Sequence, residues 1–326
     1  MCPVITLIGQ GALMNQITTL ATSTEASTAL AAWAAAARDA LACNTQRAYA
    51  ADSKAFADWC QLQGLSTLPA SPEAVAAFLR AESDAGKAVA TIRRRAATIS
   101  RMHRAAGLEN PCEHELVRLA LKGIARVKGT DQKQAAGLTE RDTLTIIDRT
   151  GDSNRNLRDV ALMLVGRDLL ARSSELVGLT VADLEETEPG MLVKLRRGKT
   201  TTETHSCFVG EAAAVALRSW LGRTGIVHGP VFQSLTKGGK ATGRALDTRD
   251  VRRILKGLAV AARLGHGKAV SGHSLRVGMA QDLVAANMDL PSVMQAGGWS
   301  TPVMVSRYTE KLTARRGAVA RYYGSR

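Results

Sequence analysis

The stretch from Ser271 to Tyr308 concentrates side chains that can bind a phosphodiester and attack it. His273 and Arg276 lie three residues apart, so a helix presents both of them on one face. Trp299 follows a glycine pair that ends a short predicted helix, and Tyr308 is expected on the outer turn of the next helix. Guanidinium, imidazole and indole groups donate hydrogen bonds to phosphate oxygens, and a phenol can act as a nucleophile. The stretch therefore predicts a phosphoryl-transfer site.

Arg172 offers a second guanidinium from a distant part of the chain. On a helix its neighbours would be Leu169 and Leu176, and a charge on an apolar stripe needs a partner or a bound anion. Glu175, three residues on, can be that partner, so a structural ion pair and an anion site are both open. Lys199 lies in the predicted β-turn of RRGKTTTE, where a lysine taken alone is usually a solvated charge.

Helices must position these groups, and the chain is predicted to be helical after a flexible tail over residues 1–24. Apolar residues then recur at helical spacing, as Ile92, Ile99 and Met102 do. The expected helices span Ala29–Leu41, Thr45–Gln61, Pro72–Gly86, Ala88–Ala106 and Pro111–Val127. They form a helical domain over residues 25–127, and the polar segment 128–137 is predicted to be a linker.

The second domain, residues 138–326, is expected to be α+β, with Thr139 capping its first helix. Gly190–Leu195 and His205–Val209 are predicted strands of a small antiparallel sheet. Further helices are expected over Asn156–Leu170, Glu211–Leu221, Thr248–Arg263 and within the stretch that follows Ser271. The predicted fold class is therefore mainly α, with a helical N-terminal domain and a second domain that contains the sheet.

Composition indicates a polyanionic partner. The 326 residues carry a net charge of +14 and a pI near 10.0, which favours nucleic acid or an anionic membrane surface. A membrane is disfavoured because no apolar run approaches the roughly 18 residues of a membrane span. Aromatic residues make up only 4% of the chain, which argues against base-stacking platforms for RNA or single strands and favours duplex DNA.

The same composition predicts a protein with reduced thiols. The five cysteines form no CxxC pair, and the N-terminus lacks the basic region of a signal peptide, so a cytoplasmic location is expected. No cofactor or metal is expected, because a phosphate-binding glycine loop and clustered carboxylates are absent from the sequence. Cys112–Glu115 is predicted to be a helix start with favourable acidic residues and not a metal site.

Two predicted helices each carry a cluster of Lys and Arg side chains, and such a positively charged helix suits a DNA groove. A solvated helix face is the plain alternative for such a cluster, and the basic excess of the whole chain favours DNA contact. The expected contacts are Arg93, Arg94, Arg95 and Arg101 on the first helix and Arg249, Arg252, Arg253 and Lys256 on the second.

Taken singly, His273 fits a structural histidine and Trp299 a core anchor, but the order of the whole set carries more information. The order Arg…Lys…His-x-x-Arg…Trp…Tyr resembles the tyrosine recombinase (phage integrase-type) family, above all its Cre-like branch. The motifs are ARSSEL, the hairpin lysine, SGHSLRVG, MQAGGW and the ninth residue after that tryptophan. Val277 and Trp299 stand where many relatives have histidine, and both differences fit the Cre-like branch.

The resemblance implies that residues 25–127 are a core-binding domain and residues 138–326 a catalytic domain with a C-terminal docking helix. Arg172 and Arg276 would then clamp the scissile phosphate, and Tyr308 would be the nucleophile. The remaining implied roles are hydrogen-bond donation by Trp299, assistance of proton loss by His273, general acid catalysis by Lys199 and orientation of a neighbouring side chain by Glu175.

The expected function is a site-specific DNA recombinase that cuts and rejoins DNA through a 3′-phosphotyrosyl intermediate without metal or ATP. A homodimer on paired inverted half-sites and a homotetramer in synapsis are implied, as is a bacterial, phage or plasmid origin. The segment Gly317–Tyr323 docks either into a neighbouring protomer or onto its own domain. Two alternatives are a catalytically inert DNA-binding protein on the same fold and a nicking-closing enzyme like type IB topoisomerases.

Overall fold

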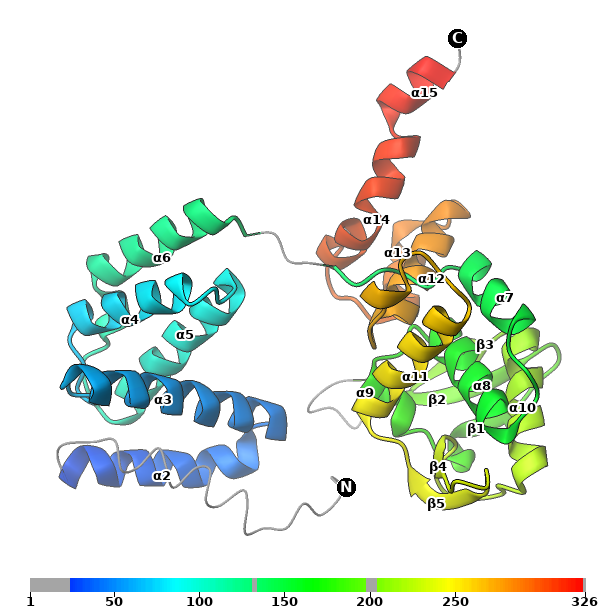
Figure 1. Cartoon of the computed structure of the whole chain (residues 1–326), viewed down its shortest axis with the longest axis horizontal. Coiled ribbons are helices and arrows are strands. Elements are labelled where there is room, and N and C mark those ends of the chain that lie inside the picture. Colours follow the sequence, from blue (N-terminus) through cyan, green and yellow to red (C-terminus); the bar gives the residue numbers. More distant parts are fainter. Residues whose placement is uncertain (1–23, 131–133, 198–203, 325–326) are drawn as a thin grey trace. The chain divides into compact units, whose positions relative to one another are not determined.

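The computed structural model describes residues 24–130, 134–197 and 204–324, and the side chains of most of them (Figure 1). The chain divides into two compact units, Met1–Lys133 and Gln134–Arg326. The predicted domain bounds, including the tail and the linker, stay predictions. Just after the predicted linker, the Leu138 N–H donates to the Ser274 carbonyl at 2.9 Å, within the second unit.

The first unit is made of helices, close to where the apolar spacing predicts them. They are α2 (Thr24–Ala40), α3 (Cys43–Gln63), α4 (Pro72–Asp84), α5 (Val89–Ala105) and α6 (Glu115–Lys128), with a 3₁₀ turn over Pro111–Glu113. The expected start at Pro72 is confirmed, because the Ser71 hydroxyl accepts from the Ala74 N–H at 3.2 Å. Phe56, Phe78 and Ile92 are buried in the core between these helices.

The second unit joins helices to two small sheets, which confirms the expected fold class. Its helices are α7 (Glu140–Asp148), α8 (Asn154–Asp168), α9 (Ser173–Val177), α10 (Glu211–Thr224), α11 (Thr248–Ala261), α12 (Ser274–Ala285), α13 (Leu290–Gly297), α14 (Val303–Arg316) and α15 (Ala318–Gly324). Its strands are β1 (Leu184–Glu186), β2 (Met191–Arg196), β3 (Thr204–Val209), β4 (Gln233–Leu235) and β5 (Ala241–Ala245). The first three strands form one antiparallel sheet and the last two another.

Helix α8 packs closely against its neighbours, among them α12. Helix α8 packs against α10 and α12, and a methyl group added at Gly166 would lie 2.7 Å from the Leu275 side chain. On α12, Gly278 packs directly against the backbone of Leu138. Glycine therefore permits the close approach of α12 to α8 at Gly166 and to the segment before α7 at Gly278.

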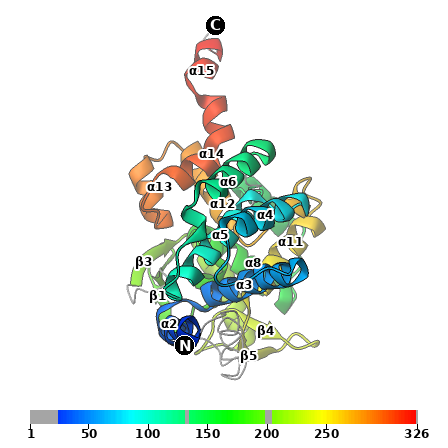
Figure 2. The same cartoon turned by 90° about the vertical axis from the view of Figure 1, so that its left-hand side faces the viewer.

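The end of the chain is the least packed part of the second unit. Helix α14 contacts α12 through its first turns, and α15 projects away from the rest of the unit (Figures 1 and 2). Val319 and Tyr323 on α15 are exposed. The last helix therefore presents apolar side chains at the surface.

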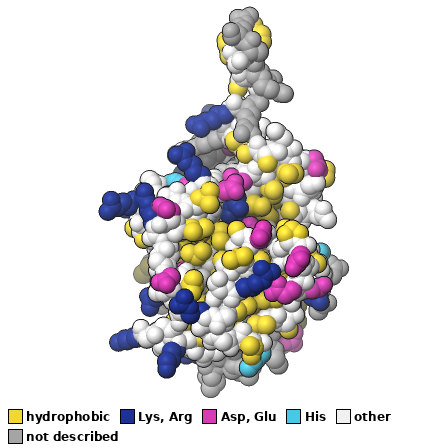
Figure 3. All heavy atoms as spheres, turned by 90° about the vertical axis from the view of Figure 1, so that its right-hand side faces the viewer, with side chains coloured by type: hydrophobic (Ala, Val, Ile, Leu, Met, Phe, Trp, Pro, Cys, Tyr) yellow, Lys and Arg dark blue, Asp and Glu magenta, His cyan; other side chains and the backbone are white. Residues whose placement is uncertain are grey.

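The surface is unevenly charged. On the face drawn in Figure 3, Lys and Arg side chains lie mainly toward one margin, and Asp and Glu gather toward the other. None of the described helices combines the length and the apolar character that a membrane span requires.

Candidate active site

Arg276 lies at the centre of the candidate site, and its side chain is buried, with 3% of the residue exposed. Its two terminal nitrogens donate to main-chain carbonyls, Nη1 to Leu170 O and Nη2 to Gly297 O, each at 2.6 Å. Its guanidinium carbon lies 4.3 Å from the centroid of the Trp299 ring. Burial lowers the pKa of Arg276 to about 10, and the positive charge of Arg172 lowers it in the same direction. Two arginines from distant segments are therefore electrostatic neighbours.

Arg172 is placed differently from the sequence prediction. It is not on an apolar helical stripe, because it precedes α9 as the N-cap residue in an extended conformation, with φ −74° and ψ 152°. Its Nη1 lies 2.5 Å from Glu175 Oε1, and its N–H donates to Glu175 Oε2 at 2.8 Å. The predicted ion pair therefore exists, and the side chain of Arg172 is still 45% exposed, so it can also face an anion.

The turn before Arg172 holds a strained residue. Leu170 has φ 44°, a left-handed conformation that is rare for residues other than glycine. The carbonyl of this residue is the one that Arg276 holds. Arg276 thus stabilises the turn of backbone that leads to Arg172.

Trp299 and Tyr308 lie edge to face, with ring centroids 6.0 Å apart and planes at 67°. Helix α13 ends at Gly297, and its C-cap residue Gly298 has φ +63°, so the chain turns sharply into Trp299. The carbonyl of Tyr308 accepts a hydrogen bond from Gln281 Nε2 at 2.9 Å, which ties α14 to α12. The candidate nucleophile is therefore joined through Trp299 to the Arg276 guanidinium.

His273 and Lys199 are less fully placed. His273 is the N-cap residue of α12, its side chain is exposed, and its N–H donates to Ser271 Oγ at 3.1 Å. Lys199 lies outside the described residues, between β2 and β3. Within the described chain, the structure brings together Arg172, Glu175, Arg276, Trp299 and Tyr308, with His273 on the helix of Arg276.

Arg197 is a buried residue of this region that the sequence reasoning missed. It lies with Arg172 and Trp299 on the wall of a concave pocket of about 820 Å³. Residues 191, 193 and 195 of β2 point inward, so the two-residue period of the strand places Arg197 on the same side. That alternation was the available signal, but the predicted strand ended at Leu195 and Arg197 fell in the predicted turn.

The basic residues of α5 divide into two groups. Arg93 and Arg101 are exposed, and Arg94 is half exposed with its Nη1 at 2.5 Å from Asp52 Oδ2. The side chain of Arg95 is only 14% exposed and is paired with Glu82 and Asp52, which disfavours its predicted role in DNA contact. The apolar spacing of α5 did not reveal that Arg95 is paired with two acids, because both acids come from other helices.

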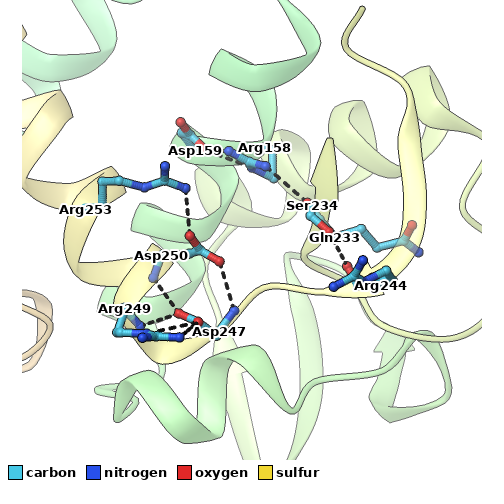
Figure 4. A network of polar contacts seen from close by, with 9 residues as sticks. All are labelled: Arg158, Asp159, Gln233, Ser234, Arg244, Asp247, Arg249, Asp250 and Arg253. Atoms are coloured by element: carbon cyan, nitrogen blue, oxygen red, sulfur yellow. Dashed lines mark hydrogen bonds and ion pairs between the residues drawn. The ribbon is translucent and has the colours of Figure 1, made fainter. Parts of the chain in front are cut away.

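On α11 the predicted residues are mostly open to solvent. The side chain of Arg249 is 92% exposed and that of Arg253 is 78% exposed, Arg252 is exposed, and Lys256 is half-buried. Figure 4 shows that Asp247 pairs with Arg249 and Asp250 with Arg253, so the first turn of α11 holds its own arginines in place. These bonds fix the start of α11 and leave its outer face available for a polyanion.

Comparison with known proteins gives family matches in both units of the chain. The phage integrase family matches residues 137–315, and the N-terminal SAM-like domain of phage integrases matches residues 35–110. An integrase/recombinase XerD homolog from Selenomonas ruminantium is 33% identical over 281 residues, which cover 82% of both chains. The Cre recombinase of Escherichia phage P1 is 30% identical over 288 residues, covering 82% of this chain and 84% of the relative.

Solved structures share the fold at lower sequence identity. The XerH site-specific recombinase bound to a palindromic difH substrate superposes with a TM-score of 0.61 at 13% identity, covering 95% of both chains. A lambda integrase dimer bound to a core site gives a TM-score of 0.58 at 18% identity, covering 82% of this chain and 89% of the other. Since one family model covers more than half of the chain and two relatives reach 30% identity or more, the chain belongs to the phage integrase family of tyrosine recombinases.

Proposed function

We propose that the protein is a site-specific DNA recombinase that breaks and rejoins duplex DNA through a 3′-phosphotyrosyl intermediate. The observation that carries the proposal is the convergence of four side chains from separate segments. Arg172 immediately precedes α9, Arg276 lies on α12, Trp299 lies in the α13–α14 connection and Tyr308 lies on α14. Relatives named as recombinases, together with recombinases solved on DNA, support the same assignment.

The arginines suit the charge that develops during the reaction. Phosphodiester transfer places negative charge on the nonbridging oxygens, and two guanidiniums can bind these oxygens through paired N–H groups. Arg172 is half exposed beside the pocket, and the buried Arg276 adds positive charge behind it. Trp299 can donate its indole N–H to the same phosphate.

Tyr308 would attack the phosphorus, form the bond to the 3′ phosphate and release the 5′ oxygen of the next nucleotide. An ordinary tyrosine has a pKa of about 10, so its proton must pass to a base or be lost in a positive field. His273 at the start of α12 is the proposed acceptor, and Lys199 is the proposed acid that protonates the leaving oxygen. Glu175 holds Arg172 in orientation through two hydrogen bonds.

The phosphotyrosyl bond retains the energy of the phosphodiester, so the reverse attack by a 5′ hydroxyl needs neither ATP nor a metal. Two protomers would bind each site through inverted half-sites, and four would form a synapse. The exposed basic residues of α5 and α11 would contact DNA. The exposed α15, which projects from its own unit, suits docking into a neighbouring protomer.

The test is covalent trapping on nicked duplexes that carry the recombination half-sites. Wild-type protein should accumulate a protein–DNA adduct, and Tyr308→Phe should form none while binding the same duplex. Recombination between two sites on one plasmid is the second measurement. Relaxation without exchange would indicate a nicking-closing enzyme, and binding without any adduct would indicate an inert DNA-binding protein.

A further inference from the structure

The connection between two helix ends depends on a residue that has no role in the chemistry above. Arg197 follows β2 directly, and only 8% of this residue is exposed. Its Nη2 donates to Leu169 O at 2.7 Å, and its Nη1 reaches Gln295 O at 3.5 Å. Because Leu169 is the C-cap residue of α8 and Gln295 lies in the last turn of α13, the guanidinium stands between two helix C-termini. Each terminus carries partial negative charge, which favours a cation there.

Arg276 makes a matching bridge beside it. Arg276 joins Leu170 O to Gly297 O, one residue further along the first turn and two residues further along the second. The strained turn at Leu170 is thus flanked by two guanidinium contacts, and Arg197 supplies one of them. A strained residue persists only where its surroundings hold it.

The two bridged segments carry the reacting groups. Arg172 follows Leu169 by three residues, and Trp299 follows Gln295 by four. Gly298 lies between, and a methyl group added there would lie 2.9 Å from Arg197 Nη1 and 3.1 Å from its Cδ. The absence of a side chain at Gly298 therefore allows Arg197 to reach its carbonyls.

We propose that Arg197 is a positioning residue for phosphoryl transfer, which holds the turn of Arg172 and the turn of Trp299 at one fixed separation. The inference rests on the proposed function, because its effect is read as the rate of DNA cleavage. Lysine keeps the charge at this position but cannot span two carbonyls with a planar fork.

The experiment compares Arg197→Lys with Arg196→Lys in the full-length protein. Arg196 is the adjacent residue, its side chain is 64% exposed, and it pairs with Asp183 outside the pocket of Arg172 and Trp299. Single-turnover cleavage should fall about 10²-fold in Arg197→Lys, the loss expected for slight misplacement of reacting groups, with DNA affinity unchanged. Arg196→Lys should cleave at the wild-type rate.

A second pair of variants covers the case in which Arg197→Lys does not fold. Gly298→Ala displaces the arginine, and Gly225→Ala imposes the same left-handed strain, since φ is +66° there and no described heavy atom lies within 4 Å of the added methyl. Gly298→Ala should lose cleavage, and Gly225→Ala should keep it.

A double-mutant cycle separates positioning from a general effect on the fold. If Arg197 acts through Trp299, the loss caused by Arg197→Lys should shrink in a Trp299→Ala background. Equal losses in both backgrounds, or a wild-type rate in folded Arg197→Lys, would overturn the inference. Adduct formation by Tyr308→Phe would instead overturn the proposed function. In that case the double-mutant cycle of Arg197 and Trp299, measured on the cleavage that remains, would still test the role of Arg197.

Discussion

At the scale of single residues, Arg276 and Arg172 differ in burial and in the groups that hold them. Arg276 is buried, and main-chain carbonyls and an aromatic face compensate its lost hydration. Arg172 is half exposed and held by Glu175. The buried Arg276 therefore holds two main-chain turns, and under the proposed function the half-exposed Arg172 is the one that solvent and substrate can reach.

Replacing Arg172 by alanine should lower the single-turnover cleavage rate about 10²- to 10³-fold, the usual effect of losing one preorganised donor to developing charge. The dissociation constant for the same duplex, measured by fluorescence anisotropy, should change little, because one of many basic groups is lost. Arg218→Ala is the matched control, since Arg218 is 42% exposed and pairs with Glu186. Equal losses of binding and cleavage would contradict the role given to Arg172.

His103 on α5 makes the first unit sensitive to acid. Its Nε2 accepts from the Ala70 N–H at 3.0 Å, its Nδ1 lies 2.9 Å from Ile99 O, and burial lowers its pKa. An ordinary histidine titrates near pH 6.5, so below that pH the unfolded chain binds the proton more readily than the folded one. The free energy of unfolding should therefore fall as pH drops from about 7 to about 5.5, by at most about 1.4 kcal/mol per pH unit.

The measurement is chemical denaturation followed by the signals of the first unit across that pH range. His103→Gln removes the titrating group and should flatten the dependence. The lowered pKa values of Glu73 and Glu113 act at lower pH. Burial raises the pKa of Asp52, which favours the folded state as pH falls and so opposes the effect of His103. The comparison with His103→Gln isolates the histidine. An unchanged slope in the variant would show that another group is responsible.

At the scale of elements, glycine contacts decide how α12 is seated. Gly278 faces the Leu138 backbone, which cannot move aside as a flexible side chain would. Since α12 carries Arg276 and contacts α14, which carries Tyr308, a shift of α12 would separate these two residues of the candidate site. The position of α12, which the contact between Gly278 and Leu138 sets, therefore matters for the geometry of the candidate site.

Gly278→Ala should destabilise the protein by about 1–3 kcal/mol or more through overpacking against backbone, and it should lower cleavage as well. Gly222→Ala on α10 is the matched control, because no described heavy atom lies within 4 Å of the added methyl. That change should stabilise by about 0.5–1 kcal/mol, the gain from replacing a helical glycine. Thermal unfolding of both variants checks the contrast.

At the scale of the whole molecule, a net charge of +14 makes DNA affinity depend on salt. The logarithm of the affinity falls linearly with the logarithm of the salt concentration, and each phosphate contact adds about 0.9 to the magnitude of this negative slope. Exposed arginines on α11 are available for such contacts, and Arg95 on α5 is enclosed by acids of its own unit. The overall charge thus overstates the number of groups that DNA can reach.

Arg252→Ala should reduce the magnitude of that slope by about 0.9, because an exposed phosphate contact is lost. Arg95→Gln, which removes the charge, should leave the slope unchanged, since the side chain of Arg95 is paired with acids inside the first unit. Filter binding of one duplex over a range of salt concentrations gives both slopes. A smaller slope for Arg95→Gln would show that Arg95 contacts DNA after all.

The order of Arg172, His273, Arg276, Trp299 and Tyr308, together with the apolar spacing of the helices, was sufficient to predict the family and the fold class. Both are local properties, because helix periodicity and motif spacing are set within a few turns of chain. The positions of α9, β1, β4 and β5 were not predicted, since elements of three to five residues leave too little periodicity to detect.

Only the tertiary structure decided which arginines are buried and what they hold. Arg197 and Arg276 take their partners from carbonyls more than twenty residues away, and Arg95 is paired with acids from α3 and α4. Arginines that look alike in the sequence thus differ in the structure: some are buried between main-chain carbonyls, some are paired with acids and some are exposed to solvent. The difference arises because the free energy of a buried cation depends on the groups that replace its water, and folding alone brings those groups together.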